Sequence, residues 1–313
     1  MNTRAIDLLF GCLLLVLTAV FLLWRGSRQE GAVAGGVPLS RESVANPIPP
    51  PDVIRKGSPQ SLVDSSSGGL QYESKRELCI VPTMAIQTLH LAPDRRDVNA
   101  VYSFLKSHGT PANMTVEEVQ ELKNDLMSKL GNITEPPMDL ADTFVSVYRD
   151  REQDFVIRDY AVQHLVSLYS KTTHTNLVQS ILWEALQETD TSIAGTALLG
   201  LSRLSQTCGE FEEARIREAA LTMVRSESSG DLPRITAIQV CAEMDVKEAL
   251  PVAEALARQS ASVPLRIAAI AALGAIGGEE QRPFLESIVA GGDQRLQPAA
   301  RAALQKLQAL AET

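Results

Sequence analysis

The stretch Leu265–Ile276, which reads LRIAAIAALGAI, decides the fold class. Four related stretches of twelve residues accompany it, at Ile157–Leu168, Ile193–Leu204, Pro233–Met244 and Leu296–Leu307. In chain order, the five stretches start 36, 40, 32 and 31 residues apart. Self-similarity at such a period is typical of repeat architectures. We therefore expect an array of similar helical units.

The five copies share a small residue at repeat position five and larger apolar residues at positions nine and twelve. Position five holds Ala161, Ala197, Ala237, Ala269 and Ala300; position nine holds Leu165, Leu201, Cys241, Leu273 and Leu304; position twelve holds Leu168, Leu204, Met244, Ile276 and Leu307. Residues four apart lie on the same face of a helix. The pattern thus predicts that a neighbouring helix approaches closely over each alanine.

Segments of different composition lie between these stretches, and we predict them to be second helices. They cover about 95–107, 176–188, 211–227, 247–259 and 280–290. Each unit is then a helix pair in which the alanine helix comes first. A sixth copy is predicted at Val81–Leu89, followed by a degenerate unit with helices at about 116–130 and 137–150. Thr115 is expected to cap the first of these two helices and Gly131 to end it.

Polar residues near the starts of the alanine helices are predicted to have structural roles. Residues placed as helix caps are Asp154, Asp190, Asp231, Ser262 and Asp293. Position two holds Arg158, Arg234 and Arg266. We expect these arginines to satisfy helix ends and to bridge adjacent units.

Composition narrows the function classes. Apolar residues make up 45% of the chain but aromatic residues only 4%, which favours tightly packed helices over a sheet sandwich. The formal net charge is -9, and without a basic run the chain cannot neutralise nucleic-acid phosphates. The four cysteines, at positions 12, 79, 208 and 241, form no metal-ligand pattern with the histidines. We expect no nucleic-acid partner, no metal and no cofactor, and Cys241 to pack as a small apolar residue.

The N-terminus is predicted to be a transmembrane anchor over residues 5–24. Leu8–Trp24 is uncharged and mostly apolar, and with Ala5 and Ile6 it reaches the roughly 20 residues that span a bilayer. Two alternatives stay open: a signal peptide cleaved after Ala34, and a lipoprotein signal at Cys12.

Residues 25–76 are predicted to be a disordered linker, because Gly, Pro and Ser make up 22 of these 52 residues. Positive charges are balanced on the two sides of the anchor, so they do not decide its orientation. Long linkers of this kind commonly follow the anchors of exported domains. We therefore expect the folded part, residues 77–313, to be extracytoplasmic.

The repeated pattern Asp-x-x-x-Arg-x-x-Ala-x-x-x-Leu resembles HEAT repeats, which are part of the ARM/HEAT superfamily of α-solenoids. The resemblance covers about Val81 to Leu310, except that residues 108–154 lack the alanine column. It implies an all-α, right-handed stack without a sheet, closed by a C-terminal cap at about 296–310. It also implies a role in protein binding, with the second helix of each pair lining the concave side.

Sequence motifs for catalysis are missing, so we expect no enzyme activity. No GxSxG, HExxH, P-loop or GxGxxG after a strand is present. His164, at position eight among small residues, is expected to be packed and hydrogen bonded. The favoured function is a membrane-tethered interaction scaffold. The alternative is a lyase or enzyme subunit that acts on a partner-bound chromophore, similar to HEAT-like phycobilin lyases.

Trp183 is the candidate anchor for a protein partner. On the helix predicted at 176–188, the apolar stripe contains Leu177, Val178, Ile181, Leu182, Ala185 and Leu186. Trp183 lies nearly opposite this stripe, between Gln179 and Gln187. Tryptophan is enriched at binding hot spots. The alternative is that Trp183 packs under the neighbouring unit.

Overall fold

The computed structural model describes residues 95–291 and 293–311, and these contain α-helices and short 3-10 turns but no strand. The helices are α3 (Arg95–Lys106), α4 (Val116–Asn132), α5 (Leu140–Arg149), α6 (Phe155–Leu168), α7 (Thr175–Ala185), α8 (Ser192–Thr207), α9 (Glu213–Arg225), α10 (Asp231–Glu243), α11 (Leu250–Gln259), α12 (Val263–Ile276), α13 (Arg282–Gly291) and α14 (Gln297–Ala311). The predicted all-α class and every helix predicted from 95 onward are confirmed, with ends that shift by a few residues.

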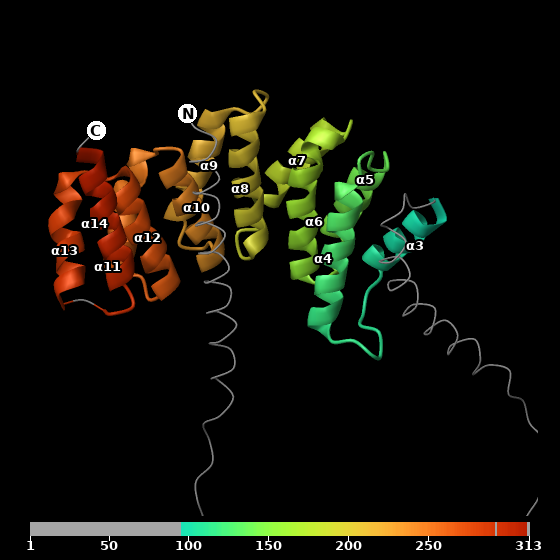
Figure 1. The fold of residues 1–313 in the computed structure, drawn as a ribbon, viewed down its shortest axis with the longest axis horizontal. Helices are drawn as coiled ribbons and strands as arrows, with labels where there is room; N and C mark the ends of the chain where they lie inside the picture. The colour runs from blue at the N-terminus through green and yellow to red at the C-terminus, as the bar shows by residue number, and fades with distance from the viewer. Residues whose placement is uncertain (1–94, 292, 312–313) are drawn as a thin grey trace, which may run out of the picture. The chain divides into compact units, whose positions relative to one another are not determined.

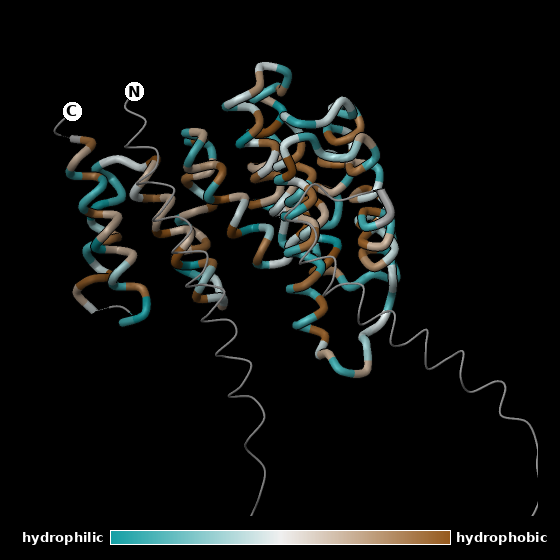
Figure 2. Tube along the Cα trace, turned by 45° about the vertical axis from the view of Figure 1, so that its right-hand side comes forward, coloured by the Kyte–Doolittle hydropathy of each residue, from teal (hydrophilic) through white to brown (hydrophobic). Residues whose placement is uncertain are grey.

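The helices form two layers (Figure 1). The alanine layer consists of α4, α6, α8, α10, α12 and α14, and each of its helices packs closely on the next. The second layer consists of α3, α5, α7, α9, α11 and α13, whose neighbours contact one another much less. Hydrophobic and hydrophilic residues are mixed along most of the helices (Figure 2), whereas α12 is apolar except for Arg266.

The order of helices within a pair differs from the prediction. From α5 onward, the alanine helices α6, α10 and α12 pack much more extensively on the second-layer helix before them than on the one after them, whereas α8 packs about equally on α7 and α9. The pairs are therefore α5 with α6, α7 with α8, and so on, and the alanine helix comes second. The repeat pattern could not show this, because a periodic sequence has the same period wherever the unit is taken to begin.

Burial confirms the predicted columns. All five alanines at position five are fully buried, as are the residues at position nine in the first four copies. Leu304, the residue at position nine of α14, is half-buried. On the same helix, Arg301, Gln305 and Lys306 are exposed. A polar outer side is what a terminal repeat needs for solubility.

Neighbouring alanine helices meet at positions ten and eight. A β-carbon added to Gly200, at position eight of α8, would overlap Val166, at position ten of α6. Likewise, one added to Gly274, at position ten of α12, would lie 2.5 Å from the Cβ of Ala303, at position eight of α14. A glycine thus faces a larger residue in each case, which lets the helix axes approach closely.

The arginines at position two satisfy helix ends, as predicted. Each donates its Nε to a carbonyl near the C-terminus of the preceding helix: Arg158 to Tyr148 at 2.7 Å, Arg234 to Val224 at 3.2 Å and Arg266 to Ala257 at 3.0 Å. These carbonyls have no partner within their own helix. Arg158 also bridges to the next unit through Glu188, whose carboxylate oxygens accept from Nη2 at 2.7 and 2.8 Å.

The predicted helix caps are confirmed in part. The Asp154 carboxylate accepts from the Val156 amide at 2.8 Å, and Thr115 forms a capping box with Glu118. The Ser262 hydroxyl accepts from the Leu265 amide at 3.5 Å.

Four predicted helix ends are wrong. The cap of α8 is Thr191 rather than Asp190, and Asp231 is already the first residue of α10, behind Gly230. Asp293 accepts from the Arg295 amide instead of capping α14. Helix α4 continues through Gly131 to Asn132, and Gly131 does not adopt the positive φ of a glycine that ends a helix. When two polar residues are adjacent, the sequence alone does not show which of them caps the helix, since either side chain can reach the free amides.

The anchor at 5–24, the linker at 25–76 and the copy at Val81–Leu89 lie outside the described residues. None of the helices from α3 to α14 is both long enough and apolar enough to span a bilayer.

Candidate interaction surface

Helix α7 presents two sides, as predicted. Val178, Ile181, Leu182 and Ala185 are buried. Trp183 lies on another side of the helix and is half-buried against the core. Of the other predicted stripe residues, Leu177 is half-buried, and Leu186 is buried but follows the last residue of α7. The predicted stripe is therefore confirmed for its central residues.

Arg215 of α9 covers the Trp183 ring. Its guanidinium carbon lies 3.8 Å from the ring centroid, which is the geometry of a cation-π contact. Gln179 is half-buried on the same helix. Gln187 is exposed, but it lies beyond the end of α7. It belongs to a turn in which its backbone N–H donates to the Glu184 carbonyl at 3.1 Å. The structure thus places Trp183 and Gln179 on one helix and Gln187 outside it.

Arginine side chains bridge the second-layer helices elsewhere too. Arg149 of α5 pairs with Glu184 of α7 at 2.6 Å. Arg258 of α11 lies 3.8 Å from the centroid of the Phe284 ring on α13. Because these helices contact one another little through their backbones, the arginine bridges span the spaces between them. The contact between Trp183 and Arg215 is one member of this series.

We expect Trp183→Ala to lower the free energy of unfolding by about 2 kcal/mol, because a half-buried indole and its cation-π contact are lost. Arg215→Ala, which leaves the indole in place, should lower the free energy of unfolding by about 0.5 kcal/mol. Chemical denaturation followed by circular dichroism measures both. Unchanged stability in Trp183→Ala would contradict the packed geometry and favour a free anchor.

The alanine layer has an open face on the side away from the second layer. Positions seven and eleven lie roughly opposite positions five and nine on a helix. Position seven holds Gln163, Leu199, Gln239, Ala271 and Ala302, and position eleven holds Ser167, Arg203, Glu243, Ala275 and Lys306. All of these side chains are exposed or half-buried. Since the helices are packed side by side, the open face continues from one unit to the next.

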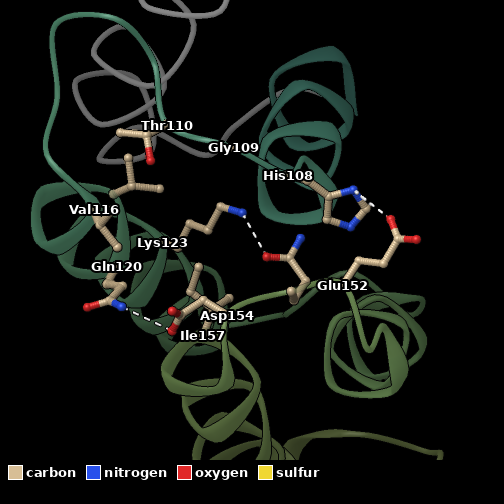
Figure 3. Close-up of a pocket in the computed structure, with 11 residues that line it drawn as sticks. His108, Gly109, Thr110, Val116, Gln120, Lys123, Glu152, Asp154 and Ile157 are labelled. Atoms are coloured by element: carbon tan, nitrogen blue, oxygen red, sulfur yellow. Dashed lines mark hydrogen bonds and ion pairs between the residues drawn. The ribbon is translucent and has the colours of Figure 1, made fainter.

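Lys123 occupies a recess at the start of the described array (Figure 3). Its side chain is buried, and its Nζ donates to the carbonyls of Leu105 at 3.1 Å and Ser107 at 2.6 Å and to the Gln153 side chain at 3.3 Å. Burial lowers the pKa of the ammonium to about 8. The three acceptors use all three ammonium protons, so Lys123 holds the end of α3 rather than presenting a free amine.

Lys123 was not predicted from the sequence, although the repeat register identifies it. If Val119 takes position five of α4, Lys123 falls at position nine, where α6, α8, α10 and α12 bury Leu or Cys. Asn124 then falls at position ten and faces His164 at position eight of α6, as the contacts between the other alanine helices require. This register was not recognised from the sequence, because α4 has valine at position five where the other copies have alanine.

His164 is packed and hydrogen bonded, as predicted. Its Nε2 lies 2.8 Å from Oδ1 of Asn124, and burial lowers the pKa of the imidazole to about 4. Cys241 is fully buried in the core, where burial raises the pKa of its thiol to about 12. Across residues 95–291 and 293–311, no group of three or more potential metal ligands comes together.

Comparison with known proteins agrees with this architecture. Residues 217–305, from within α9 to within α14, match the family model described as HEAT repeats. This match shows HEAT repeats over residues 217–305, and similar helix pairs continue from there back to α5. No curated protein matches the chain.

Among solved structures, the human deoxyhypusine hydroxylase in complex with glycerol shares 17% identity, over 77% of this chain and 100% of that one. Its TM-score of 0.29 is too low to compare shapes or activities.

Proposed function

We propose that this protein is a membrane-tethered scaffold that binds another protein on the open face of its alanine layer. The observation that carries the proposal is the continuity of this face across consecutive HEAT-like pairs. A stack of repeats creates an extended surface of this kind, which repeat proteins use for binding. The tether is the segment predicted at residues 5–24.

The reversed pair order supports the choice of face. The HEAT resemblance implies that the second helix of each pair lines the concave side, and in this structure the second helix is the alanine helix. The closer spacing of the alanine helices agrees, because the more closely spaced layer of a curved stack lies on its inner side. Trp183 belongs to the second layer and not to the open face. It is therefore an alternative site for the protein partner.

The face is polar and mixed in charge on α6 and α10, and it is lined by the small apolar residues Ala271 and Ala275 on α12. Gln163 and Ser167 on α6 are uncharged, whereas Arg203 on α8 and Glu243 on α10 carry opposite charges. Burial raises the pKa of Glu243, and the charge of Arg203 opposes that shift. A partner suited to this face has a polar, hydrogen-bonding surface, because polar groups left unpaired in an interface cost binding energy.

Proximity labelling with the full chain in its own cell tests the proposal. Gln163→Arg combined with Ala271→Arg places two bulky charges at exposed sites on the open face, and the control Thr222→Arg places one at an exposed site on the second layer. We expect the first variant to lose labelling of specific proteins by about tenfold or more, and the control to keep it. Circular dichroism checks that both variants fold.

Two results would contradict the proposal. Loss of labelling in Trp183→Ala, but not in the open-face variant, would move the interface to the second layer. Labelling no stronger than that of residues 1–76 alone would argue against a scaffold. A visible absorption band gained with a chromophore would support the lyase alternative instead.

A further inference from the structure

Helix α4 is the first alanine helix among the described residues, so no preceding alanine helix covers it there. In the later copies, positions four and eight point toward the preceding alanine helix. A β-carbon added to Gly195 of α8 would lie 2.9 Å from the hydroxyl of Thr236, at position four of α10. One added to Gly274 of α12 would lie 2.5 Å from the Cβ of Ala303, at position eight of α14. Positions four and eight therefore define the side of α4 that an earlier helix would contact.

This side of α4 holds Glu118 at position four and Leu122 at position eight, in the register that the contact of Asn124 with His164 defines. Glu118 is exposed and Leu122 is half-buried. On α8, α10, α12 and α14, by contrast, the residue at position eight is buried. A large apolar side chain is thus left partly accessible on α4 at a position that the preceding helix covers in those copies.

The chain itself supplies a segment with the right pattern, directly before α3. Val81–Leu89 carries the repeat, with Ala85 at position five and Leu89 at position nine. Residues 90–94 connect it to α3, and this connection is as long as that of residues 208–212, between α8 and α9. Helix α8, which precedes α9, packs on α10, the next alanine helix. By the same order, the neighbour of the segment before α3 is α4.

Polar groups match at one end of this contact. By the register of the other copies, Thr83 at position three of the segment would lie beside Glu118 of α4. Between α6 and α8, the same two positions hold Asp159 and Thr196, whose hydroxyl forms a hydrogen bond with the carboxylate. The pairing of a hydroxyl with a carboxylate therefore recurs, with the two partners exchanged.

Charge also favours this occupant. The exposed surface of α4 is acidic, because Glu117, Glu118, Glu121 and Asp125 are all exposed. Residues 81–92 contain no carboxylate and are mostly apolar. Such a segment brings no like charge to α4, and packing there removes its apolar side chains from water.

We propose that the side of α4 that carries Leu122 is the docking site for the chain's own residues 81–92, which pack there as one more alanine helix with His90, at position ten, on Leu122. The docked segment extends the open face by one helix, because Gln87 falls at position seven and Leu91 at position eleven. The docking does not depend on the proposed function, and it would hold for a chain with no protein partner.

Disulfide cross-linking in the full chain tests the docking, with every cysteine except the buried Cys241 replaced by serine. His90→Cys with Leu122→Cys places the two thiols at facing positions. Thr88→Cys with Leu122→Cys is the matched control, because position eight of the segment would point away from α4. A segment that is only tethered gives both pairs the same effective concentration. We expect the first pair to cross-link within one chain at least about tenfold faster than the control.

Two results of this experiment would overturn the proposal. Rates that agree within about twofold for the two pairs would show that the segment is not held on α4. Cross-links that form between two chains, and not within one, would show that a second copy occupies this side of α4 instead.

Hydrogen exchange gives a second readout without new thiols. Leu89→Arg places a charge at position nine, which α6, α8, α10 and α12 bury, and should detach the segment. We expect protection of the α4 amides to fall by about tenfold, while protection in α12 changes by less than about threefold. Gln87→Arg, at position seven on the open face, should leave α4 protected. Equal protection of α4 in the two variants would contradict the docking.

Discussion

Gly274→Ala is expected to weaken the contact between α12 and α14 by about 3 kcal/mol. The new β-carbon would lie 2.5 Å from the Cβ of Ala303 and overlap its Cα. A backbone atom cannot move aside as a flexible side chain can, so the two helices must separate. Because repeats contribute stability through nearest-neighbour contacts, the loss should concentrate at the C-terminal end. Hydrogen exchange in α14 should rise by about 100-fold, while α8 changes little.

Gly131→Ala is the matched control. Gly131 lies in α4, and an added β-carbon there meets no atom within 4 Å. The same change should stabilise this helix by roughly 0.5 to 1 kcal/mol, because alanine loses less conformational entropy on folding. Similar effects of the two substitutions would show that helix propensity, and not close approach, governs the glycine sites.

Arg158→Met is expected to lower the free energy of unfolding by about 3 kcal/mol. The substitution leaves the Tyr148 carbonyl without its donor at 2.7 Å and removes one of the two arginines that pair with Glu188. Loss of one partner from a buried ion pair is costly because the remaining charge stays desolvated. Urea denaturation followed by circular dichroism measures the change.

Arg266→Met is the comparison for this prediction. Arg266 occupies the same repeat position and donates to the Ala257 carbonyl at 3.0 Å, but it is half-buried and has no ion-pair partner among the described residues. Arg266→Met should lower the free energy of unfolding by about 1 kcal/mol, which is the net contribution of one hydrogen bond. An equal loss in both variants would mean that the bridge to Glu188 adds nothing.

The fold was predictable because the same residues recur at the same helical positions. Alanine at position five, leucine at position nine and arginine at position two each make a contact that is repeated along the array. Each copy of the pattern is therefore independent evidence for the same helix packing. Pair order was not predictable, because periodicity carries no information about where a unit begins. Helix caps were predicted unevenly, since Thr191 and Asp190 are adjacent and either could accept the first free amides of α8.

The candidate site was less predictable, for a physical reason. Helical geometry placed Trp183 away from the stripe of α7, but the residue that covers its ring, Arg215, comes from the next pair, and such contacts have no fixed sequence spacing. Lys123 was hidden because Val119 interrupts the alanine column. Packing and hydrogen bonding of His164 were predictable, because a histidine in a small, apolar column must be packed.

The position of the open face depends on the register in which position ten of one alanine helix meets position eight of the next. A double-mutant cycle between Val166 and Gly200 measures this contact directly. In wild-type protein, Gly200→Ala places a β-carbon against Val166 Cγ2, and we expect a loss of about 2 kcal/mol. In a Val166→Ala background the overlap disappears, and the same change should be neutral or stabilise by up to about 1 kcal/mol. Equal effects in the two backgrounds, within about 0.5 kcal/mol, would contradict the register.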